Sequence, residues 1–122
     1  MAYGVTIDRS EPGVAVVSLR GEHETYTAPK LERELDGLLD EGVALVVDLT
    51  EATFVDSSVV SVLLRIREAA AATDLAFFLV MDDRTGSSVR TLFEVTGLRA
   101  VFPVAASREE AVDAVRGQAA WS

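Results

Sequence analysis

Apolar and polar residues alternate near the start of the chain in the manner of two short strands. Residues 5–8 alternate strictly, and residues 14–20 are mostly apolar. Between them, the sequence Glu11-Pro12-Gly13 is typical of a turn, because proline fixes φ and glycine tolerates left-handed backbone. The pattern therefore predicts two strands joined as a hairpin.

Two segments further along carry the spacing of amphipathic helices. Leu31, Leu35, Leu38 and Leu39 recur on one helix face, after a segment at 25–30 that offers a cap and an early proline. This helix should end near Gly42. A second helix is predicted over residues 58–72, where one stripe is apolar and another is polar. The apolar stripe comprises Val59, Val62, Leu63, Ile66 and Ala70, and the polar stripe comprises Ser61, Arg65 and Glu68.

Apolar runs between the helical segments predict buried strands. Residues 44–49 and 75–81 are almost entirely apolar, and residues 101–104 form a shorter run. Strands covered on both faces have this composition. A short helix carrying Val89, Leu92 and Phe93 is predicted before the last strand. A final helix should follow Ser107, which forms a capping-box pattern with Glu110.

The predicted elements follow the order β-β-α-β-α-β-α-β-α with short connections. Such alternation is typical of an α/β fold in which helices pack against a central sheet. A chain of 122 residues is close to the commonest size of one domain. We therefore expect a single domain over residues 1–122.

The charge of the chain limits the classes of molecule that it could bind. It carries 20 acidic and 11 basic residues, a formal net charge of -9, so its surface should repel nucleic acid and anionic headgroups. No apolar run approaches the roughly 18 residues that span a bilayer, and no secretory signal is recognisable. We expect a cytoplasmic protein with no nucleic-acid partner and no membrane insertion. The absence of cysteine excludes disulfides and thiolate chemistry.

Few residues are suited to catalysis. His23 is the single histidine, and we interpret it as a surface loop residue and not as a catalytic base. An acidic rim would form if neighbouring strand ends meet, although acidic side chains in such a chain are usually only solvated. The rim would comprise Glu22, Glu24, Asp48, Glu51 and Asp56. We expect no enzymatic activity, cofactor or metal site. A function as an enzyme or a small-molecule sensor is the least favoured of three hypotheses.

Asp56-Ser57-Ser58 lies where the second helix is predicted to begin. Aspartate and serine are preferred helix caps, worth about 1 kcal/mol, and that role alone would account for them. The same location suits a modification, because free N–H groups and the helix dipole favour negative charge there. A phosphoserine adds about 1.5 to 2 negative charges and would disrupt a docked acidic or apolar surface. Spacing alone leaves both interpretations open.

Several segments, in this order, resemble the STAS domain family and its bacterial anti-sigma factor antagonists. Residues 17–25, Val-Ser-Leu-Arg-Gly-Glu-His-Glu-Thr, are similar to the family's Leu-x-Gly-Glu-Leu-Asp turn, with Glu24 keeping the acid. Residues 46–49 and the later Phe-Val-Asp-Ser-Ser at 54–58 resemble its central strand and Asp-Ser helix start. Residues 88–98, 101–104 and 107–111 look like its third helix, last strand and final helix.

This resemblance implies a STAS-like α/β fold: a mixed sheet of four or five strands with about four helices packed mainly on one face. It also implies a protein-binding switch in which Ser57 is phosphorylated by an anti-sigma factor serine kinase, a histidine-kinase-like ATPase. The unphosphorylated form sequesters the kinase and frees a sigma factor, and a PP2C-type phosphatase resets the switch. The implied partner surface comprises Glu22, Glu24, Asp56, Ser57, Ser58, Ser61 and Arg65.

One segment departs from the family's pattern. The family commonly continues with Gly-Leu-Gly after the serines, whereas this chain has Val59-Val60-Ser61. The departure adds two side chains and a hydroxyl where small residues allow close approach. It favours an alternative function: a STAS scaffold or adaptor subunit that is not phosphorylated, in a stressosome-like assembly or with a lipid transporter.

Overall fold

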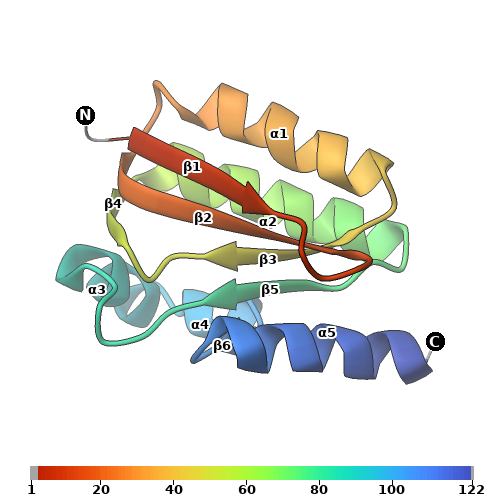
Figure 1. Ribbon diagram of the computed structural model, residues 1–122. Helices are drawn as coiled ribbons and strands as arrows, with labels where there is room; N and C mark the ends of the chain where they lie inside the picture. The colour runs from red at the N-terminus through yellow and green to blue at the C-terminus, as the bar shows by residue number, and fades with distance from the viewer. Residues whose placement is uncertain (1–2, 122) are drawn as a thin grey trace.

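A computed structural model describes residues 3–121 of the chain (Figure 1). Strands and helices alternate along these residues much as the hydrophobic pattern predicts. The elements are β1 (Tyr3–Asp8), β2 (Val14–His23), α1 (Ala28–Asp40), β3 (Ala44–Asp48), β4 (Ala52–Val55), α2 (Ser57–Ala72), β5 (Phe77–Val80), α3 (Ser87–Val95), α4 (Leu98–Val101), β6 (Val104–Ala105) and α5 (Arg108–Trp121).

The strands form one mixed sheet in the order β1-β2-β3-β5-β6. Only β1 runs antiparallel to its neighbour, and the pairs β2–β3, β3–β5 and β5–β6 are parallel. Strand β2 extends beyond β3, and its last residues pair in parallel with β4 after a register shift between Gly21 and Glu22. The parallel strands therefore all end at one edge of the sheet, which we call the carboxyl edge.

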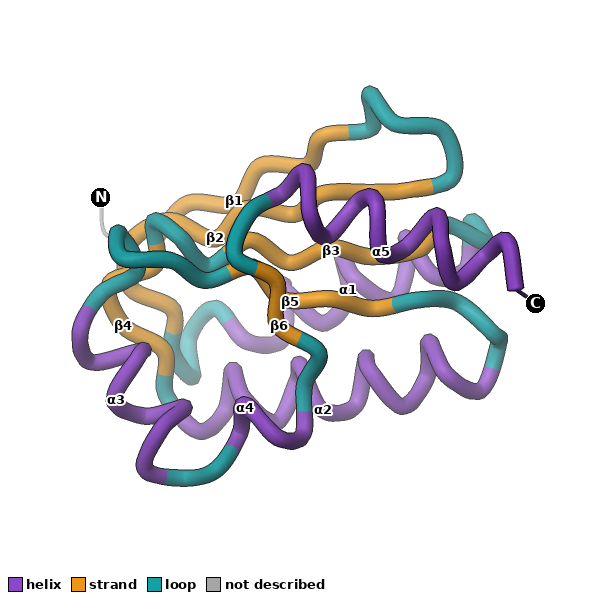
Figure 2. The backbone as a smooth tube through the Cα atoms, turned by 90° about the horizontal axis from the view of Figure 1, so that it is seen from below, coloured by secondary structure: helices purple, strands orange, loops and turns teal. Residues whose placement is uncertain are grey.

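Helices α1 and α2 cover one face of the sheet, and α5 covers the other (Figures 1 and 2). Alternate strand residues divide between the two faces, as the pleat requires. Val17 and Val47 join the larger core with Leu31, Leu63 and the other buried residues of α1 and α2. Helices α3 and α4 also contribute to this core. A smaller core lies between the opposite face and α5.

The predicted fold class is confirmed, since a mixed sheet carries most of its helices on one face. The structure adds two elements that the hydrophobic pattern did not reveal, β4 and α4. The last strand was predicted at residues 101–104, and this was wrong. Gly97, with φ +73°, introduces the short helix α4 instead. Phe102 then turns into the core against Phe77 and Phe93, so β6 begins only at Val104.

The predicted apolar stripe of the second helix is confirmed, because every one of its five residues is buried in α2. Within the described residues, none of the helices combines the length and apolar character needed to cross a bilayer. Helices α1, α2, α3 and α5 each follow a strand that ends at the carboxyl edge. Their N-termini therefore gather at that edge, where the candidate site lies (Figure 1).

Candidate functional site

Asp56 is the centre of the candidate site because it caps α2. Its backbone is extended, and its Oδ1 accepts a hydrogen bond from the Val59 N–H at 3.1 Å. This is the aspartate cap that the sequence predicted. The helix itself begins at Ser57, one residue earlier than expected.

The second carboxylate oxygen of Asp56 binds the loop between β2 and α1. Asp56 Oδ2 accepts hydrogen bonds from the backbone N–H of Thr25 at 2.9 Å and from its hydroxyl at 3.1 Å. The Thr25 hydroxyl also lies 2.8 Å from the Ser58 hydroxyl. The Asp56 N–H in turn donates to the carbonyl of His23 at 3.2 Å. Two segments about thirty residues apart are thus fastened together at the start of α2.

These contacts set the charge state of Asp56. Partial burial by itself would raise the pKa of this carboxyl, but hydrogen bonds from the Val59 N–H, the Ser58 hydroxyl and Thr25 outweigh burial and hold the pKa below its usual value. Asp56 is therefore a carboxylate at neutral pH. Its charge is stabilised by uncharged donors and by the N-terminus of the helix.

The two serines that follow Asp56 differ in exposure. Ser57 is exposed at the first position of α2, whereas Ser58 is half-buried and its hydroxyl contacts Thr25. Of the two serines, Ser57 is thus the one whose hydroxyl another molecule can approach freely.

The departure from the family's Gly-Leu-Gly pattern changes the surface less than its residue types suggest. Val59 is fully buried, and Val60 is half-buried against the larger core. Ser61 is exposed one helical turn beyond Ser57. Of the added groups, the Ser61 hydroxyl and part of Val60 are the ones that reach the outside.

The other predicted surface residues lie around this point. Glu22 and Glu24 are exposed on either side of His23, at the end of β2. Within residues 3–121, neither has a cation within ion-pair distance. Arg65 is exposed two turns along α2, and its guanidinium binds both oxygens of Glu32 on α1, at 2.8 and 2.9 Å.

Two aromatic side chains near the site were not recognised from the sequence. Tyr26 is 94% exposed in the loop that Thr25 anchors, and Phe54 is 39% exposed on β4. Strand β4 buries Ala52 and Val55 and exposes the two residues between them. Thr25 was also missed, because nothing in its local sequence indicates a contact with Asp56.

His23 is not the surface loop residue that the sequence suggested. It is the last residue of β2 and is fully buried, with Nε2 3.0 Å from the carbonyl oxygen of Arg20. The alternation that turns Val17 and Leu19 towards the larger core continues along β2, so the His23 side chain points inward while both flanking glutamates point outward. Burial lowers the pKa of His23, although hydrogen bonding to the backbone of Arg20 and Gly4 partly opposes this effect.

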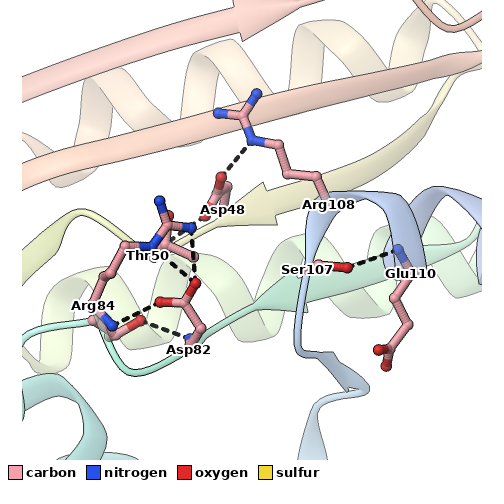
Figure 3. Close-up of polar contacts among 8 residues, drawn as sticks. Asp48, Thr50, Asp82, Arg84, Ser107, Arg108 and Glu110 are labelled. Atoms are coloured by element: carbon pink, nitrogen blue, oxygen red, sulfur yellow. Dashed lines mark hydrogen bonds and ion pairs between the residues drawn. The ribbon is translucent and has the colours of Figure 1, made fainter.

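The acidic rim does not form as one cluster. Asp48 points to the α5 face and is 4% exposed, where it accepts hydrogen bonds from Arg108 Nε at 2.6 Å and from the Thr50 N–H at 2.9 Å (Figure 3). Asp56 binds Thr25 instead. In the part of the chain that the structure describes, no three acidic or histidine side chains gather closely enough to hold a metal ion.

The start of α5 confirms half of the predicted capping box. The Glu110 N–H donates to the Ser107 hydroxyl at 3.1 Å. The Glu110 carboxylate points away from Ser107 in Figure 3. Arg108, the first residue of α5, is thereby aimed at Asp48 and Ser18 on the sheet.

Comparison with known proteins identifies the family to which this chain belongs. The STAS domain profile matches residues 7–111. The chain belongs to the STAS domain family. BtrV of Bordetella bronchiseptica, whose name assigns it provisionally to the anti-sigma factor antagonists, is 30% identical over 113 residues, 92% of this chain and 94% of BtrV.

Solved STAS structures share the architecture described above. The crystal structure of an anti-sigma factor antagonist from Mycobacterium paratuberculosis aligns with a TM-score of 0.77 at 29% identity, covering 93% of this chain and 94% of that one. The anti-sigma factor antagonist SpoIIAA in its unphosphorylated form also aligns with a TM-score of 0.77, at 22% identity, over 93% of this chain and 97% of SpoIIAA. At that identity the SpoIIAA likeness concerns the fold alone.

Proposed function

We propose that this STAS protein is an anti-sigma factor antagonist that works as a non-catalytic phosphoswitch. In its unphosphorylated form it sequesters an anti-sigma factor serine kinase, a histidine-kinase-like ATPase, in the cytoplasm. Phosphorylation of Ser57 releases the kinase, and a PP2C-type phosphatase restores the binding form. The names of the relatives support the antagonist role, and the surface at the start of α2 supports the switch.

The observation that carries the proposal is that Ser57 is exposed next to Asp56, whose carboxylate is fixed by hydrogen bonds. Helix α2 is capped by Asp56 and not by Ser57, so a phosphate on Ser57 removes no bond that the structure records for the cap. The N-terminus of a 16-residue helix also favours added negative charge. The fold should therefore tolerate the modification.

Charge repulsion explains the release. The kinase supplies ATP and Mg²⁺, so nucleotide phosphates lie opposite Ser57 when it docks. After transfer, a phosphoserine bearing about 1.5 to 2 negative charges faces the phosphates of ADP across a desolvated interface. Like charges at short range disfavour the complex. The change is local, and this chain needs no cofactor of its own.

The proposed contact surface surrounds Ser57. It comprises Glu22, Glu24, Asp56, Ser57, Ser58, Ser61 and Arg65. Glu22 and Glu24 carry charges that no cation of the described chain neutralises, so they suit basic side chains at the rim of the partner's site. Arg65 would meet the partner through the outer side of its ion pair with Glu32.

Phosphate mapping tests the proposal. The protein is incubated with ATP, Mg²⁺ and the histidine-kinase-like anti-sigma factor from the same genome, and the products are analysed by mass spectrometry. We expect one phosphate, on Ser57, and none on the Ser57→Ala protein. Ser87→Ala is the matched control, since it removes an exposed serine from the first position of another helix, α3, outside the proposed contact surface, and should leave labelling intact. An active kinase that leaves Ser57 unmodified would reject the phosphoswitch.

The scaffold function is the second candidate, and Val60 and Ser61 favour it because they enlarge the surface at which a kinase would dock. It predicts that binding of the natural partner does not depend on charge at Ser57. If Ser57→Ala and Ser57→Asp bind that partner equally, the scaffold is supported. A weaker affinity of Ser57→Asp alone supports the phosphoswitch.

A further inference from the structure

We infer that Thr25 determines which serine of the proposed switch accepts phosphate, by holding the Ser58 hydroxyl and leaving Ser57 to the kinase. The inference rests on the proposed function and concerns a residue of the β2–α1 loop, thirty-two positions before the acceptor. Ser57 and Ser58 are adjacent, so a docked kinase meets both hydroxyls within one helical turn. Something other than distance along the chain must select between them.

The contacts of Thr25 provide that selection. Its hydroxyl donates to Asp56 Oδ2 at 3.1 Å and lies 2.8 Å from the Ser58 hydroxyl. A hydroxyl has only one proton, and an ionised carboxylate can only accept. With the Thr25 proton directed to Asp56, the Ser58 proton is the one left for the Thr25–Ser58 contact, and the Asp56 carboxylate shares it. Hydrogen bonds therefore run from Ser58 to Asp56 both directly and through Thr25.

These hydrogen bonds restrain Ser58 but do not involve the Ser57 side chain. Ser58 is half-buried, whereas Ser57 is exposed. The backbone N–H of Thr25, at 2.9 Å from Asp56 Oδ2, closes the arrangement and fixes the loop over Ser58. Hydrogen bonds that share donors and acceptors in this way reinforce one another.

Phosphoryl transfer requires a hydroxyl that is free to reach ATP, and the Ser58 hydroxyl is not free. The serine oxygen must reach the γ-phosphorus of ATP and form a bond to it, while the bond from that phosphorus to the ADP oxygen breaks. The hydroxyl proton passes to a base of the kinase. Ser58 would have to break its contact with Thr25 and rotate outward first, but Ser57 can react from where it stands. A lost neutral hydrogen bond of this kind corresponds to roughly a fivefold to tenfold preference.

Thr25→Val is the informative substitution. Valine has nearly the shape of threonine and keeps the backbone N–H bond to Asp56, but it removes the hydroxyl that holds Ser58. Thr27→Val is the matched control from the same loop. The Thr27 hydroxyl donates to the Glu24 carbonyl at 3.0 Å and accepts from the Glu24 N–H at 3.1 Å, so its hydrogen bonds stay within the loop and away from Ser58.

The experiment is carried out in the Ser57→Ala protein, with the kinase and ATP. With Thr25 intact, we expect little phosphate on Ser58. Adding Thr25→Val should raise phosphorylation of Ser58 at least fivefold, Thr25→Ser should not, and Thr27→Val should not. Equal labelling of Ser58 with and without the Thr25 hydroxyl would overturn the inference. Failure of the kinase to label Ser57 in the unaltered protein would instead overturn the proposed function.

A readout that needs no kinase accompanies this test. The pKa of Asp56, followed by NMR, should rise towards its usual value in Thr25→Val because one donor to the carboxylate is lost. Thr27→Val should leave the pKa of Asp56 unchanged. An Asp56 pKa that does not respond to Thr25→Val would show that the hydroxyl contact is absent in solution, which also overturns the inference.

Discussion

Asp56 and Asp48 lie at the same edge of the sheet and are held in opposite ways. Asp48 is buried against the guanidinium of Arg108, a contact between charges that joins α5 to the sheet. Asp56 is held by N–H groups and hydroxyls, none of them charged. The cation neutralises Asp48, whereas Asp56 keeps its negative charge at a surface that other molecules can reach.

The two aspartates differ in role: Asp48 joins α5 to the sheet, whereas Asp56 lies beside the candidate phosphorylation site. Around Asp48, Arg108 also contacts Ser18 and lies 4.0 Å from Asp8, so the polar groups there are engaged within the protein. Around Asp56, the neighbouring Ser57 remains exposed. A site built from neutral donors can thus change charge without breaking an ion pair, and this is what the proposed function needs.

The largest effect on stability should come from Arg108→Ala. It leaves the buried Asp48 carboxylate without its cation, and an uncompensated buried charge is strongly destabilising. Because Arg108 itself is partly exposed and screened, we expect a loss of about 2 kcal/mol in the free energy of unfolding, measured with urea. Arg116, on the same helix as Arg108, forms an exposed ion pair with Glu11 of the β1–β2 turn, and Arg116→Ala should cost no more than about 0.5 kcal/mol. Equal losses would contradict the contrast.

Asp56→Ala should have the next largest effect. It removes the cap of α2 and the acceptor for Thr25, and loss of such a cap costs about 1 to 2 kcal/mol. Urea denaturation measures the loss, and hydrogen exchange should become faster in the β2–α1 loop. Ser57→Ala should stay within about 0.5 kcal/mol of the unaltered protein, since Ser57 is exposed. A destabilising Ser57→Ala would mean that Ser57 has a structural role.

The buried His23 should make stability depend on pH below neutrality. Its pKa is lowered in the folded protein, mainly by burial, from a usual value of 6.5. The unfolded chain therefore binds a proton more readily than the folded one. Stability should be complete above about pH 6.5 and should fall as the pH drops towards the lower folded pKa. Thermal unfolding of His23→Gln should show a flatter profile in this window, and an unchanged profile would contradict the assignment.

The smallest effect should come from Arg65→Ala. The ion pair with Glu32 joins α1 and α2 at the surface, and such exposed pairs contribute little to stability. Even this contribution should fade at high salt, because salt screens exposed charges. Urea denaturation at low and high ionic strength measures the difference. A loss as large as that of Asp56→Ala, unchanged by salt, would show that the pair stabilises the fold more than expected.

The local pattern of apolar and polar residues predicted many of the helices and strands. The helical stripe from Val59 to Ala70 and the Asp56 cap were readable because a helix repeats every 3.6 residues and its start favours particular side chains. The apolar strands were readable because both their faces are covered. Ser57 could be placed at the helix start for the same reason.

Contacts between distant segments could not be predicted in this way. The bond between Thr25 and Asp56 joins residues that are 31 positions apart, and that between Asp48 and Arg108 joins residues 60 apart. Neither leaves a trace in local periodicity. His23 was misplaced because β2 continues to residue 23, beyond its predicted end at residue 20, and pairs there with β4, a strand that the sequence did not reveal. The alternation that buries Val17 and Leu19 therefore buries His23 as well.

The affinity of the anti-sigma kinase for unmodified and Ser57-phosphorylated protein tests the central claim most directly. Isothermal titration calorimetry in the presence of ADP should show that phosphorylation weakens binding by about 100-fold, equivalent to about 2.7 kcal/mol. The same affinity for both forms would contradict the account, because charge at Ser57 would then not govern the association.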